Sequence, residues 1–446
     1  MKNNHTDTIA AIATATGNAA IAIVRMSGPQ AIAIASELAG PELRPREAQL
    51  RTLQTASGEP IDTALVLCFP GPQSYSGEDL VEFQIHGSPV IADWLLETLF
   101  AAGARPAEPG EFTLRAFLND KLDLTQAEAV ADLVASHSRA GVSAAGRSLQ
   151  GRFSARVMQL LNTLTQARVQ LEAHLDFPDE DIEPEEIAQL RAAIDAALEE
   201  IDTLRAEARS GVVLRDGLNV AIAGPPNAGK SSLLNHLAGY DAAIVTDIPG
   251  TTRDPLREQI VLDGLPVQIV DTAGLRETQD PIEVEGARRA QIAGTQADRI
   301  LWLQDVRDGE AAARAAAYEA FGDSELITIV LNKIDLLDLQ PSHPDAECLH
   351  ISALTGAGID ALIAHLKATA GWREGTEGAF TARRRHLEAL ERARAHLAAA
   401  REPLATQSEL AAEELRMAQA ALSEITGEFT SDDLLGEIFS SFCIGK

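Results

Sequence analysis

The segment 224–231 has the residue types and spacing of a loop that binds phosphate groups. It reads Gly-Pro-Pro-Asn-Ala-Gly-Lys-Ser, after the apolar run 220–223 and before a helical pattern over 232–237. In such a strand–loop–helix segment, glycines let backbone N–H groups approach the phosphates. We expect Lys230 to reach the β- and γ-phosphates and the Ser231 hydroxyl to bind Mg²⁺. A glycine turn before a helix is the simpler interpretation of this loop taken alone.

A second motif predicts recognition of a guanine base. Asn332-Lys333-Ile334-Asp335 follows the apolar run 327–331, so it is expected at a strand end. The Asp335 carboxylate can accept hydrogen bonds from both the N1–H and the exocyclic amine of guanine. Adenine has a single amine donor on that edge, and an unpaired buried carboxylate oxygen is costly. The motif therefore favours GTP over ATP, and Ser352-Ala353, after the strand 349–351, is expected to cover the base.

Two further motifs are expected to complete the nucleotide site. Asp271-Thr272-Ala273-Gly274 follows the strand 267–270, which places Asp271 to support the magnesium ion and leaves Gly274 free to turn toward the γ-phosphate. The segment 250–254 reads Gly-Thr-Thr-Arg-Asp and is expected to bring Thr252 to the same ion.

The order of these motifs predicts a doubly wound α/β domain that binds its ligand at the carboxyl edge of the sheet. We expect the following residues to bind GTP: Asn227, Ala228, Gly229, Lys230, Ser231, Ser232, Thr246, Asp247, Ile248, Pro249, Gly250, Thr251, Thr252, Asp271, Thr272, Ala273, Gly274, Asn332, Lys333, Asp335, Ser352 and Ala353.

One residue common in nucleotide switches is missing. Many of them carry a glutamine directly after the Asp-x-x-Gly motif to orient the attacking water. Here that position is Leu275, which cannot hydrogen-bond to water. Asn227 offers a side-chain oxygen near the bond between the β- and γ-phosphates, where a monovalent cation could replace an arginine finger. Alternatively, Asn227 is a loop residue that hydrogen-bonds its own backbone.

Composition limits the possible classes of protein. The chain has 446 residues, which suggests roughly three domains, and 46% of them are apolar. Cys68, Cys348 and Cys443 lack disulfide or zinc spacing, so we expect a cytoplasmic location. The polar segment 1–8 has no targeting pattern, and no apolar run reaches the length of a membrane span. A net charge of −29 disfavours indiscriminate binding to nucleic acid.

The nucleotide-binding pattern is expected to be an insert. It spans residues 214–372, and the flanking segments 119–213 and 373–446 are rich in Ala, Leu, Glu and Arg with helical spacing. We interpret them as one helical domain split by the insertion, with two independent helical linkers as the alternative. Residues 1–118 alternate short apolar runs with helical stretches and are expected to form a separate α+β domain. The overall fold class is therefore multidomain α/β.

Arginines are unevenly distributed along the helical segments. Residues 133–171 contain no Asp or Glu but five arginines: Arg139, Arg147, Arg152, Arg156 and Arg168. This stretch could be a patch that binds phosphates. It could equally be solvated helix surface, or pair with the acidic run 176–186. The cluster 383–385 could likewise bind phosphates, or it could be a helix start whose arginines pair with carboxylates.

With these residues in view, the whole chain resembles the MnmE (TrmE) family of bacterial tRNA modification GTPases. The resemblance runs from Arg25-Met26-Ser27-Gly28, through Pro109-Gly110-Glu111-Phe112 and the segment 116–124, to the terminal Phe442-Cys443-Ile444-Gly445-Lys446. It implies an N-terminal domain for folate binding and dimerisation, a split helical domain and an inserted Ras-like G domain.

The resemblance also implies an activity and partners. A homodimer would act on tRNA in a complex with the FAD-dependent protein MnmG. Together they would place an aminomethyl or carboxymethylaminomethyl group on C5 of the wobble uridine. The one-carbon unit would come from a tetrahydrofolate derivative, in its 5,10-methylene or 5-formyl form.

Several site residues follow from the family's pattern position by position. The potassium ligands fall on Asn227, Thr246, Ile248 (through its carbonyl) and Thr251, and the magnesium ligands on Ser231 and Thr252. The water-orienting glutamate falls on Glu283, which could otherwise be the acidic first turn of a helix. The catalytic set is then Glu283, Asn227, Lys230 and Cys443, although a lone cysteine can simply be buried.

The family's folate contacts fall on Arg25, Glu82, Lys121 and Lys446. Cationic and anionic groups suit a ligand that has a glutamate tail and a ring bearing hydrogen-bond donors. Without the resemblance, the first three would be ordinary surface charges and Lys446 a loose end.

A different class of function shares the nucleotide motifs. Ribosome-assembly GTPases carry the same five motifs but act as RNA-binding switches, and they usually have an RNA-binding domain after the G domain. The front domain 1–118 and the Cys-Ile-Gly-Lys end favour the modifying enzyme. A purely structural scaffold would not need Lys230 or Asp271.

Overall fold

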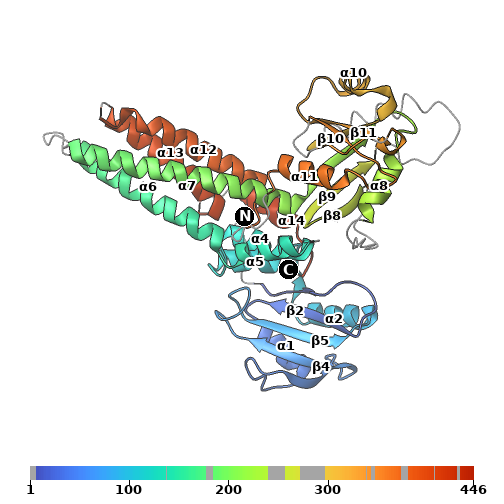
Figure 1. Ribbon diagram of the computed structural model, residues 1–446. Helices are drawn as coiled ribbons and strands as arrows, with labels where there is room; N and C mark the ends of the chain where they lie inside the picture. The colour runs from blue at the N-terminus through green and yellow to red at the C-terminus, as the bar shows by residue number, and fades with distance from the viewer. Residues whose placement is uncertain are drawn as a thin grey trace. The chain divides into compact units, whose positions relative to one another are not determined.

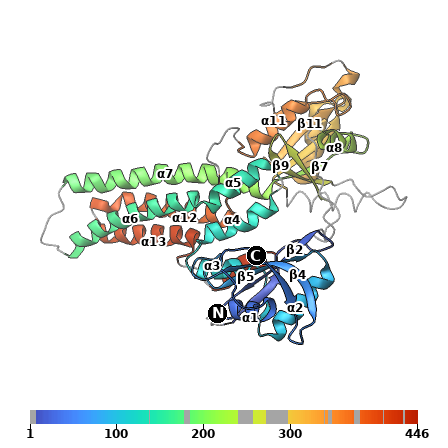
Figure 2. The same cartoon turned by 90° about the horizontal axis from the view of Figure 1, so that it is seen from below.

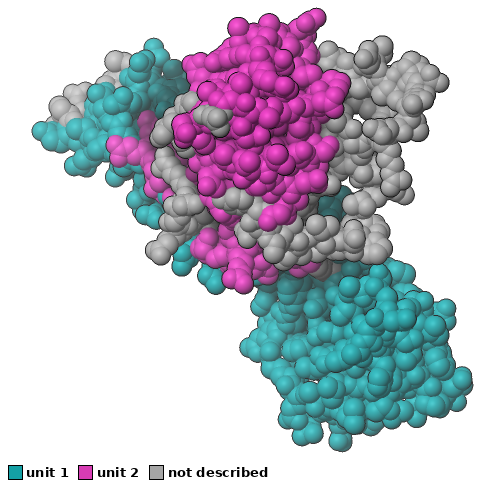
Figure 3. All heavy atoms as spheres, turned by 45° about the vertical axis from the view of Figure 1, so that its right-hand side comes forward, with its two compact units in different colours: residues 1–131, 148–197, 392–446 teal, residues 132–147, 198–391 magenta. Residues whose placement is uncertain are grey.

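The computed structural model describes residues 7–136, 138–176, 184–239, 257–271, 297–337, 339–342, 347–372, 380–405, 407–428 and 432–445 (Figure 1). Its contacts divide the chain into two compact units, coloured separately in Figure 3. The first contains Met1–Ala131, Ser148–Ala197 and Arg392–Lys446, and the second contains Asp132–Arg147 and Leu198–Glu391.

The N-terminal part of the first unit is built on a six-stranded sheet with the order β3-β4-β5-β2-β1-β6. Its strands are β1 (Ile9–Ile12), β2 (Ile21–Ser27), β3 (Gln49–Gln54), β4 (Pro60–Phe69), β5 (Leu80–His86) and β6 (Arg105–Pro106). All neighbouring strands are antiparallel except β1 and β6, which are parallel. The helices of this part are α1 (Ala31–Ala39), α2 (Pro89–Ala101) and α3 (Glu111–Leu118).

Side chains that alternate along the central strands divide this sheet into two faces. Val24 and Met26 of β2 are fully buried in a core that includes residues of α1 and α2. Because successive strand residues point to opposite faces, Arg25 lies on the other face. There Ile9 and Ala11 of β1 pack with Phe112 of α3. The predicted α+β character of the N-terminal region is thereby confirmed.

Long helices form most of the remainder of the first unit and extend into the second. They are α4 (Leu124–Ala135), α5 (Arg139–Leu149), α6 (Arg152–Asp176), α7 (Pro184–Asp216), α12 (Arg384–Arg401), α13 (Ser408–Thr426) and α14 (Asp432–Ser440). Helices α6 and α13 run side by side, as Figure 2 shows. Between them, Gln419 accepts a hydrogen bond from Arg168 at 2.6 Å and donates one to Thr165 at 2.7 Å.

The helical spacing expected within the segment 373–446 is confirmed in α12. Leu390, Ala393 and Leu397 of α12 have no exposed surface, because residues three and four positions apart share one face of a helix. A short turn, η3 (Pro403–Ala405), separates α12 from α13.

The second unit contains a six-stranded sheet with the order β12-β11-β10-β7-β9-β8. Its strands are β7 (Leu218–Ala223), β8 (Arg257–Leu262), β9 (Leu265–Asp271), β10 (Arg299–Asp305), β11 (Ile327–Asn332) and β12 (Cys348–His350). Only β8 is antiparallel to its neighbour, which it joins through a tight turn. The helices are α8 (Lys230–Ala238), α10 (Glu310–Phe321) and α11 (Ile359–Thr369), with short turns η1 (Val306–Asp308) and η2 (Ile334–Leu336).

Helices cover both faces of this sheet. Val220 and Ile222 of β7 pack in a core with residues of α8 and α11, whereas Ala221 and Ala223 pack on the opposite face with residues of α10. A strand buried on both faces is apolar at every position, which explains the continuous apolar runs in the sequence. The predicted doubly wound α/β domain is confirmed.

The chain enters and leaves this α/β part at neighbouring points. On the last turns of α7, the Ser210 hydroxyl donates a hydrogen bond to the carbonyl of Gly371, two residues after α11. Asp132 pairs with Arg215 of the entering helix at 2.9 Å and with Arg383 of the leaving segment at 3.3 Å. An inserted domain requires that its two ends lie close together. The same contacts show that Arg383 pairs with a carboxylate.

Among the described helices, none is both long and apolar enough to cross a membrane.

Substitutions at two helical glycines test the packing where the chain enters and leaves the α/β part. A Cβ atom at Gly211 of α7 would lie 2.2 Å from the carbonyl oxygen of Phe380, whereas one at Gly146 of α5 would meet nothing within 4 Å. We expect Gly211→Ala to destabilise the protein by about 1–3 kcal/mol, because backbone must move. Gly146→Ala should be neutral or stabilise by up to about 1 kcal/mol, since alanine favours the helix. Urea unfolding measures both, and equal midpoints for the two variants would contradict this packing.

Candidate nucleotide-binding site

The phosphate-binding motif forms the turn between β7 and α8. Lys230 is the first residue of α8, and its ammonium group donates hydrogen bonds to the carbonyls of Gly224 at 2.8 Å and Pro225 at 2.9 Å. Ser231 follows it on the helix and is exposed. Asn227 is exposed at the tip of the loop with a positive φ of 62°. The loop therefore presents a cation, a hydroxyl and the N–H groups of a helix N-terminus, a combination that suits phosphate.

The loop approaches the base motif so closely that only glycine fits at residue 229. Its φ is 101°, and a Cβ atom there would lie 2.2 Å from the side-chain nitrogen of Asn332. Such a cradle fits a nucleotide whose phosphates lie against the backbone.

Asn332 connects the phosphate-binding loop to the base-binding segment. It is 2% exposed at the end of β11. Its Nδ2 donates to the carbonyl of Ala228 at 2.8 Å, and its Oδ1 accepts from the N–H of Ala353 at 2.9 Å. Three of the predicted motifs thus meet at one side chain, at the carboxyl edge of the sheet.

Asp335 is presented by the turn η2, which follows Asn332 and Lys333. The hydroxyl of the fully buried Ser352 donates to Asp335 Oδ1 at 2.5 Å and accepts from the N–H of Thr355 at 3.2 Å. The Asp335 residue itself is exposed. Ser352 thus orients a carboxylate that remains accessible to a base.

Sequence reasoning missed Asp305, which contacts the predicted Lys333. Asp305 is the last residue of β10, and its Oδ2 lies 2.9 Å from Lys333 Nζ. Hydrogen bonds from Arg307, followed by those from Lys333, hold the pKa of the Asp305 carboxyl far below its usual value. The available signal was an aspartate directly after an apolar strand, the same signal that marks Asn332.

Many of the predicted nucleotide ligands lie outside the described residues. These are Thr246, Asp247, Ile248, Pro249, Gly250, Thr251, Thr252, Thr272, Ala273, Gly274 and Glu283. Asp271 ends β9, which pairs in parallel with β7, so its backbone lies at the same sheet edge as the phosphate loop.

In the N-terminal domain, the predicted pair Arg25 and Glu82 lies on adjacent strands. The two residues are register partners on β2 and β5, and the Arg25 guanidinium donates to Glu82 Oε1 at 2.8 and 3.0 Å. The guanidinium carbon lies 5.3 Å from the ring centre of Tyr75 and 5.8 Å from that of Phe112. Both charged side chains are partly exposed, at 22% and 17%. The pair offers a cation, an anion and two aromatic rings on one face of the sheet.

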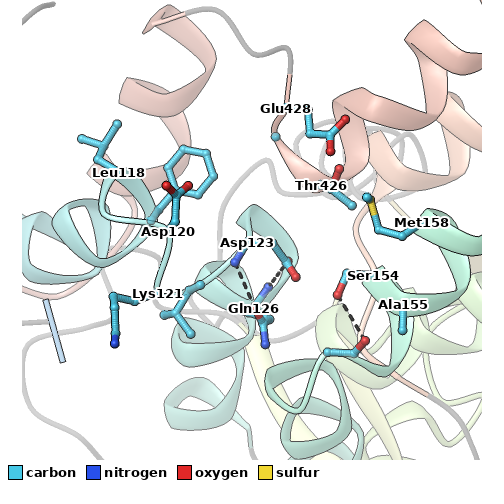
Figure 4. A pocket seen from close by; sticks show the side chains of 14 residues that line it. Leu118, Asp120, Lys121, Asp123, Gln126, Ser154, Ala155, Met158, Thr426 and Glu428 are labelled. Carbon is cyan, nitrogen blue, oxygen red and sulfur yellow. Dashed lines mark hydrogen bonds between the residues drawn. The ribbon is translucent and has the colours of Figure 1, made fainter. Parts of the chain in front are cut away.

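Lys121 lines a cavity of about 620 Å³. Its polar lining residues include Asp120, Lys121, Asp123, Gln126, Ser154 and Glu428. Met158 and Thr426 also line it, on the side away from Lys121 (Figure 4). Arg25 and Glu82 are not among its lining residues. The Lys121 ammonium donates to the carbonyl of Pro72 at 3.0 Å, so the loop that carries Pro72 and Tyr75 contacts both predicted folate positions.

A buried arginine, also missed from sequence, anchors this loop. Arg115 is 1% exposed and donates to Glu78 at 3.0 Å, to Glu111 at 2.9 Å and to Asp7 at 2.8 Å. Burial would raise the pKa of the Glu111 carboxyl, but hydrogen bonds from Arg105 and Arg115 outweigh burial and hold the pKa below its usual value. The Pro-Gly-Glu-Phe motif thus supplies Glu111 to this charge network and Phe112 to Arg25.

The C-terminal tail reaches the N-terminal domain within the first unit. The carbonyl of Cys443 accepts a hydrogen bond from the N–H of Gly110 at 3.3 Å, and Phe439 and Phe442 pack with Leu124 in one apolar cluster. The Cys443 residue is exposed rather than buried, and Lys446 lies outside the described residues.

Comparisons with known proteins cover the whole chain. The model for the MnmE helical domain matches residues 124–443, and the model for the N-terminus of the GTP-binding protein TrmE matches residues 8–121. The curated tRNA modification GTPase MnmE of Alkalilimnicola ehrlichii is 52% identical over 444 residues, which cover 98% of this chain and 99% of that protein. The chain belongs to the MnmE family of tRNA modification GTPases.

Other comparisons agree with the family or are more distant. The MnmE protein of Aeromonas hydrophila is 50% identical over 451 residues, covering 99% of this chain and 100% of that protein. Among solved structures, Aquifex aeolicus Era bound to GDP.AlF4- is 27% identical with a TM-score of 0.27, covering 40% of this chain and 66% of that one. A TM-score this low supports no conclusion about this member of the MnmE family.

The Asn332 bridge can be tested through stability. We expect Asn332→Ala to lower the free energy of unfolding by about 2–4 kcal/mol, because it leaves the buried N–H of Ala353 and the carbonyl of Ala228 without their partner. Asn235→Ala, on the exposed surface of α8, is the matched control and should change it by less than about 0.5 kcal/mol. Urea unfolding without nucleotide measures both, and equal effects would show that the bridge adds no stability.

Proposed function

We propose that the chain hydrolyses GTP and, with an FAD-dependent MnmG-like partner, modifies C5 of the wobble uridine of tRNA. Support comes from relatives named tRNA modification GTPases, which align with at least 98% of this chain. The observation that carries the proposal is the Asn332 bridge, which holds the phosphate loop and the segment of Ser352 and Ala353 at one sheet edge. Such an edge is where doubly wound sheets bind nucleotides.

In this proposal each end of GTP meets its own group of residues. Lys230 binds the β- and γ-phosphates, and the accessible Asp335 carboxylate, oriented by Ser352, pairs with guanine. Ser231 and Thr252 would hold Mg²⁺, supported by Asp271. The ion supplies positive charge where the β- and γ-oxygens become more negative. The proposed nucleotide site consists of all the residues that the sequence predicts to bind GTP, including the segments 246–252 and 271–274.

Hydrolysis needs a further positive charge and an oriented water. Asn227, Thr246, the carbonyl of Ile248 and Thr251 would hold K⁺, in the role that an arginine finger has elsewhere. Exposure of Asn227 at the loop tip leaves its side chain available to such an ion. Glu283 would orient the water, a task that Leu275 cannot perform. Closure of the segment 246–251 is expected when two G domains of a homodimer meet.

The one-carbon unit is proposed to come from 5,10-methylene- or 5-formyltetrahydrofolate bound by the N-terminal domain. Arg25 and Glu82 fit the donors and acceptors of its ring, and Tyr75 and Phe112 supply aromatic surface nearby. Lys121 and Lys446 would pair with its carboxylates. Cys443, exposed on the tail that reaches Gly110, would act as a nucleophile or general acid.

We propose the following domain boundaries and setting for this activity. Residues 1–118 bind folate and dimerise, 119–213 and 373–446 form the helical domain, and 214–372 form the G domain. Opening of the G domains after hydrolysis would move the helical domain and so the folate and tRNA sites. The expected location is the cytoplasm, where tRNA, folate and GTP are present together.

Potassium dependence is tested by steady-state hydrolysis. We expect GTP turnover in KCl to exceed that in NaCl by on the order of tenfold to a thousandfold, the range for one group that stabilises transition-state charge. Na⁺ is smaller and fits ligands spaced for K⁺ poorly. Asn227→Ala should lose the difference between the salts, and Asn235→Ala on the exposed face of α8 should keep it. Equal turnover in both salts, or full activity of Asn227→Ala, would refute the cation's role.

The wobble modification is tested in cells that lack this protein. Mass spectrometry of tRNA nucleosides should show loss of the aminomethyl and carboxymethylaminomethyl groups on wobble uridine, restored by the unaltered gene. Arg25→Ala should fail to restore them while it still hydrolyses GTP, because it removes the cation beside Glu82 without touching the G domain. Arg44→Ala, which removes an arginine with a 68% exposed side chain from the same domain, is the control and should restore them.

Unchanged wobble nucleosides in those cells would contradict the modifying function. Co-sedimentation of the protein with ribosomal subunits, together with no binding of 5-formyltetrahydrofolate, would instead favour a ribosome-assembly GTPase.

A further inference from the structure

An ion pair joins the end of strand β10 to the residue that follows strand β11. Asp305, the last residue of β10, is the register partner of Asn332, the last residue of β11. Lys333 follows Asn332, and its Nζ donates to Asp305 Oδ2 at 2.9 Å. The contact therefore spans adjacent strands at the sheet edge that carries the phosphate loop.

A second cation holds the same carboxylate from the other side. Arg307 donates through its backbone N–H and its Nε to Asp305 Oδ1 at 3.1 and 2.9 Å, and through a terminal nitrogen to Oδ2 at 2.7 Å. The side chain of Asp305 is only 13% exposed. Its pKa is held far below the usual value, first by Arg307 and then by Lys333, so the carboxylate is charged at neutral pH.

The backbone of Lys333 adopts a conformation that needs support. Its φ is +69°, in the left-handed region that residues other than glycine adopt mainly where their surroundings impose it. From this residue the chain enters the turn η2, which contains Asp335. The N–H of Ile334 donates to Ile351 at 3.2 Å, and the N–H of Leu336 donates back to Lys333 at 3.1 Å. The direction of the Asp335 carboxylate therefore depends on how Lys333 is held.

We infer that Asp305 is a positioning residue for the guanine base: it fixes Lys333 across the strand ends and so fixes the turn that presents Asp335. This inference rests on the proposed guanine-nucleotide site. Asp305 acts at the base end of the ligand, away from the γ-phosphate. Its loss should weaken GTP and GDP binding by the same factor and leave the hydrolytic step unchanged.

A double-mutant cycle in the full-length protein tests the coupling. Asp305→Asn removes the charge at nearly constant size, and Lys333→Met removes the ammonium group while keeping the stem. We expect each substitution to raise the Kd for GDP and for GTP by about tenfold, and Asp305→Asn to leave kcat at saturating GTP unchanged. The double variant should bind no more weakly than the weaker single variant, because both substitutions break the same contact.

Two controls separate this role from a loss of fold. Asp308→Asn alters an exposed aspartate three residues further on. It should change neither the Kd for GDP or GTP nor kcat by more than about twofold. Asp305→Glu keeps the carboxylate and should recover part of the affinity lost in Asp305→Asn. This variant also supplies the comparison if Asp305→Asn fails to fold.

The outcomes distinguish the inference from the function on which it rests. Independent, multiplicative effects of Asp305→Asn and Lys333→Met on Kd would overturn the positioning role, as would a lower kcat with unchanged Kd. No recovery with Asp305→Glu would also overturn it. Failure of the unaltered protein to bind GDP or GTP would overturn the proposed nucleotide site itself.

Discussion

The nucleotide-binding edge of this protein depends on one buried carboxamide. Asn332 satisfies the carbonyl of Ala228 in the phosphate loop and the N–H of Ala353 in the base-covering segment. Both groups are buried and would otherwise have no partner there, so the two segments are held in a fixed relation. The relative positions of the Lys230 and Asp335 side chains, at opposite ends of the proposed ligand, therefore depend on this bridge.

In the N-terminal domain, ion pairs connect separate segments in the way that Asn332 does at the nucleotide-binding edge. Arg115 has almost no exposed surface, yet three carboxylates surround it: Asp7, Glu78 and Glu111. A buried guanidinium is tolerated only when it is paired in this way. The network connects the chain start, the loop before β5 and the start of α3, and it supports the face on which Arg25 lies between Tyr75 and Phe112.

Much of the fold was predictable from spacing. Apolar runs followed by glycine, lysine, aspartate or asparagine predicted the strands and their functional ends, and the confirmed elements β7, α8 and β11 lie where these patterns indicated. Long-range contacts were not predictable. Asp305 has the same strand-end signal as Asn332, but its pairing with Lys333 depends on β10 lying beside β11. Likewise, the contacts of Asp132 with Arg215 and Arg383 join residues that are far apart in the chain.

The sequence by itself determined the chemistry available at each strand end and the family to which the chain belongs. The chemistry follows from residue type and local spacing, because a loop or a strand end is built from consecutive residues, whereas the family follows from the resemblance of the whole chain to known proteins. Only the tertiary structure decided that Arg25 faces Glu82 and two aromatic rings, that Lys121 lines a cavity, and that Asp305 holds Lys333. Strand order and the packing of helices on the sheets set those contacts, and neither can be read from neighbouring residues alone.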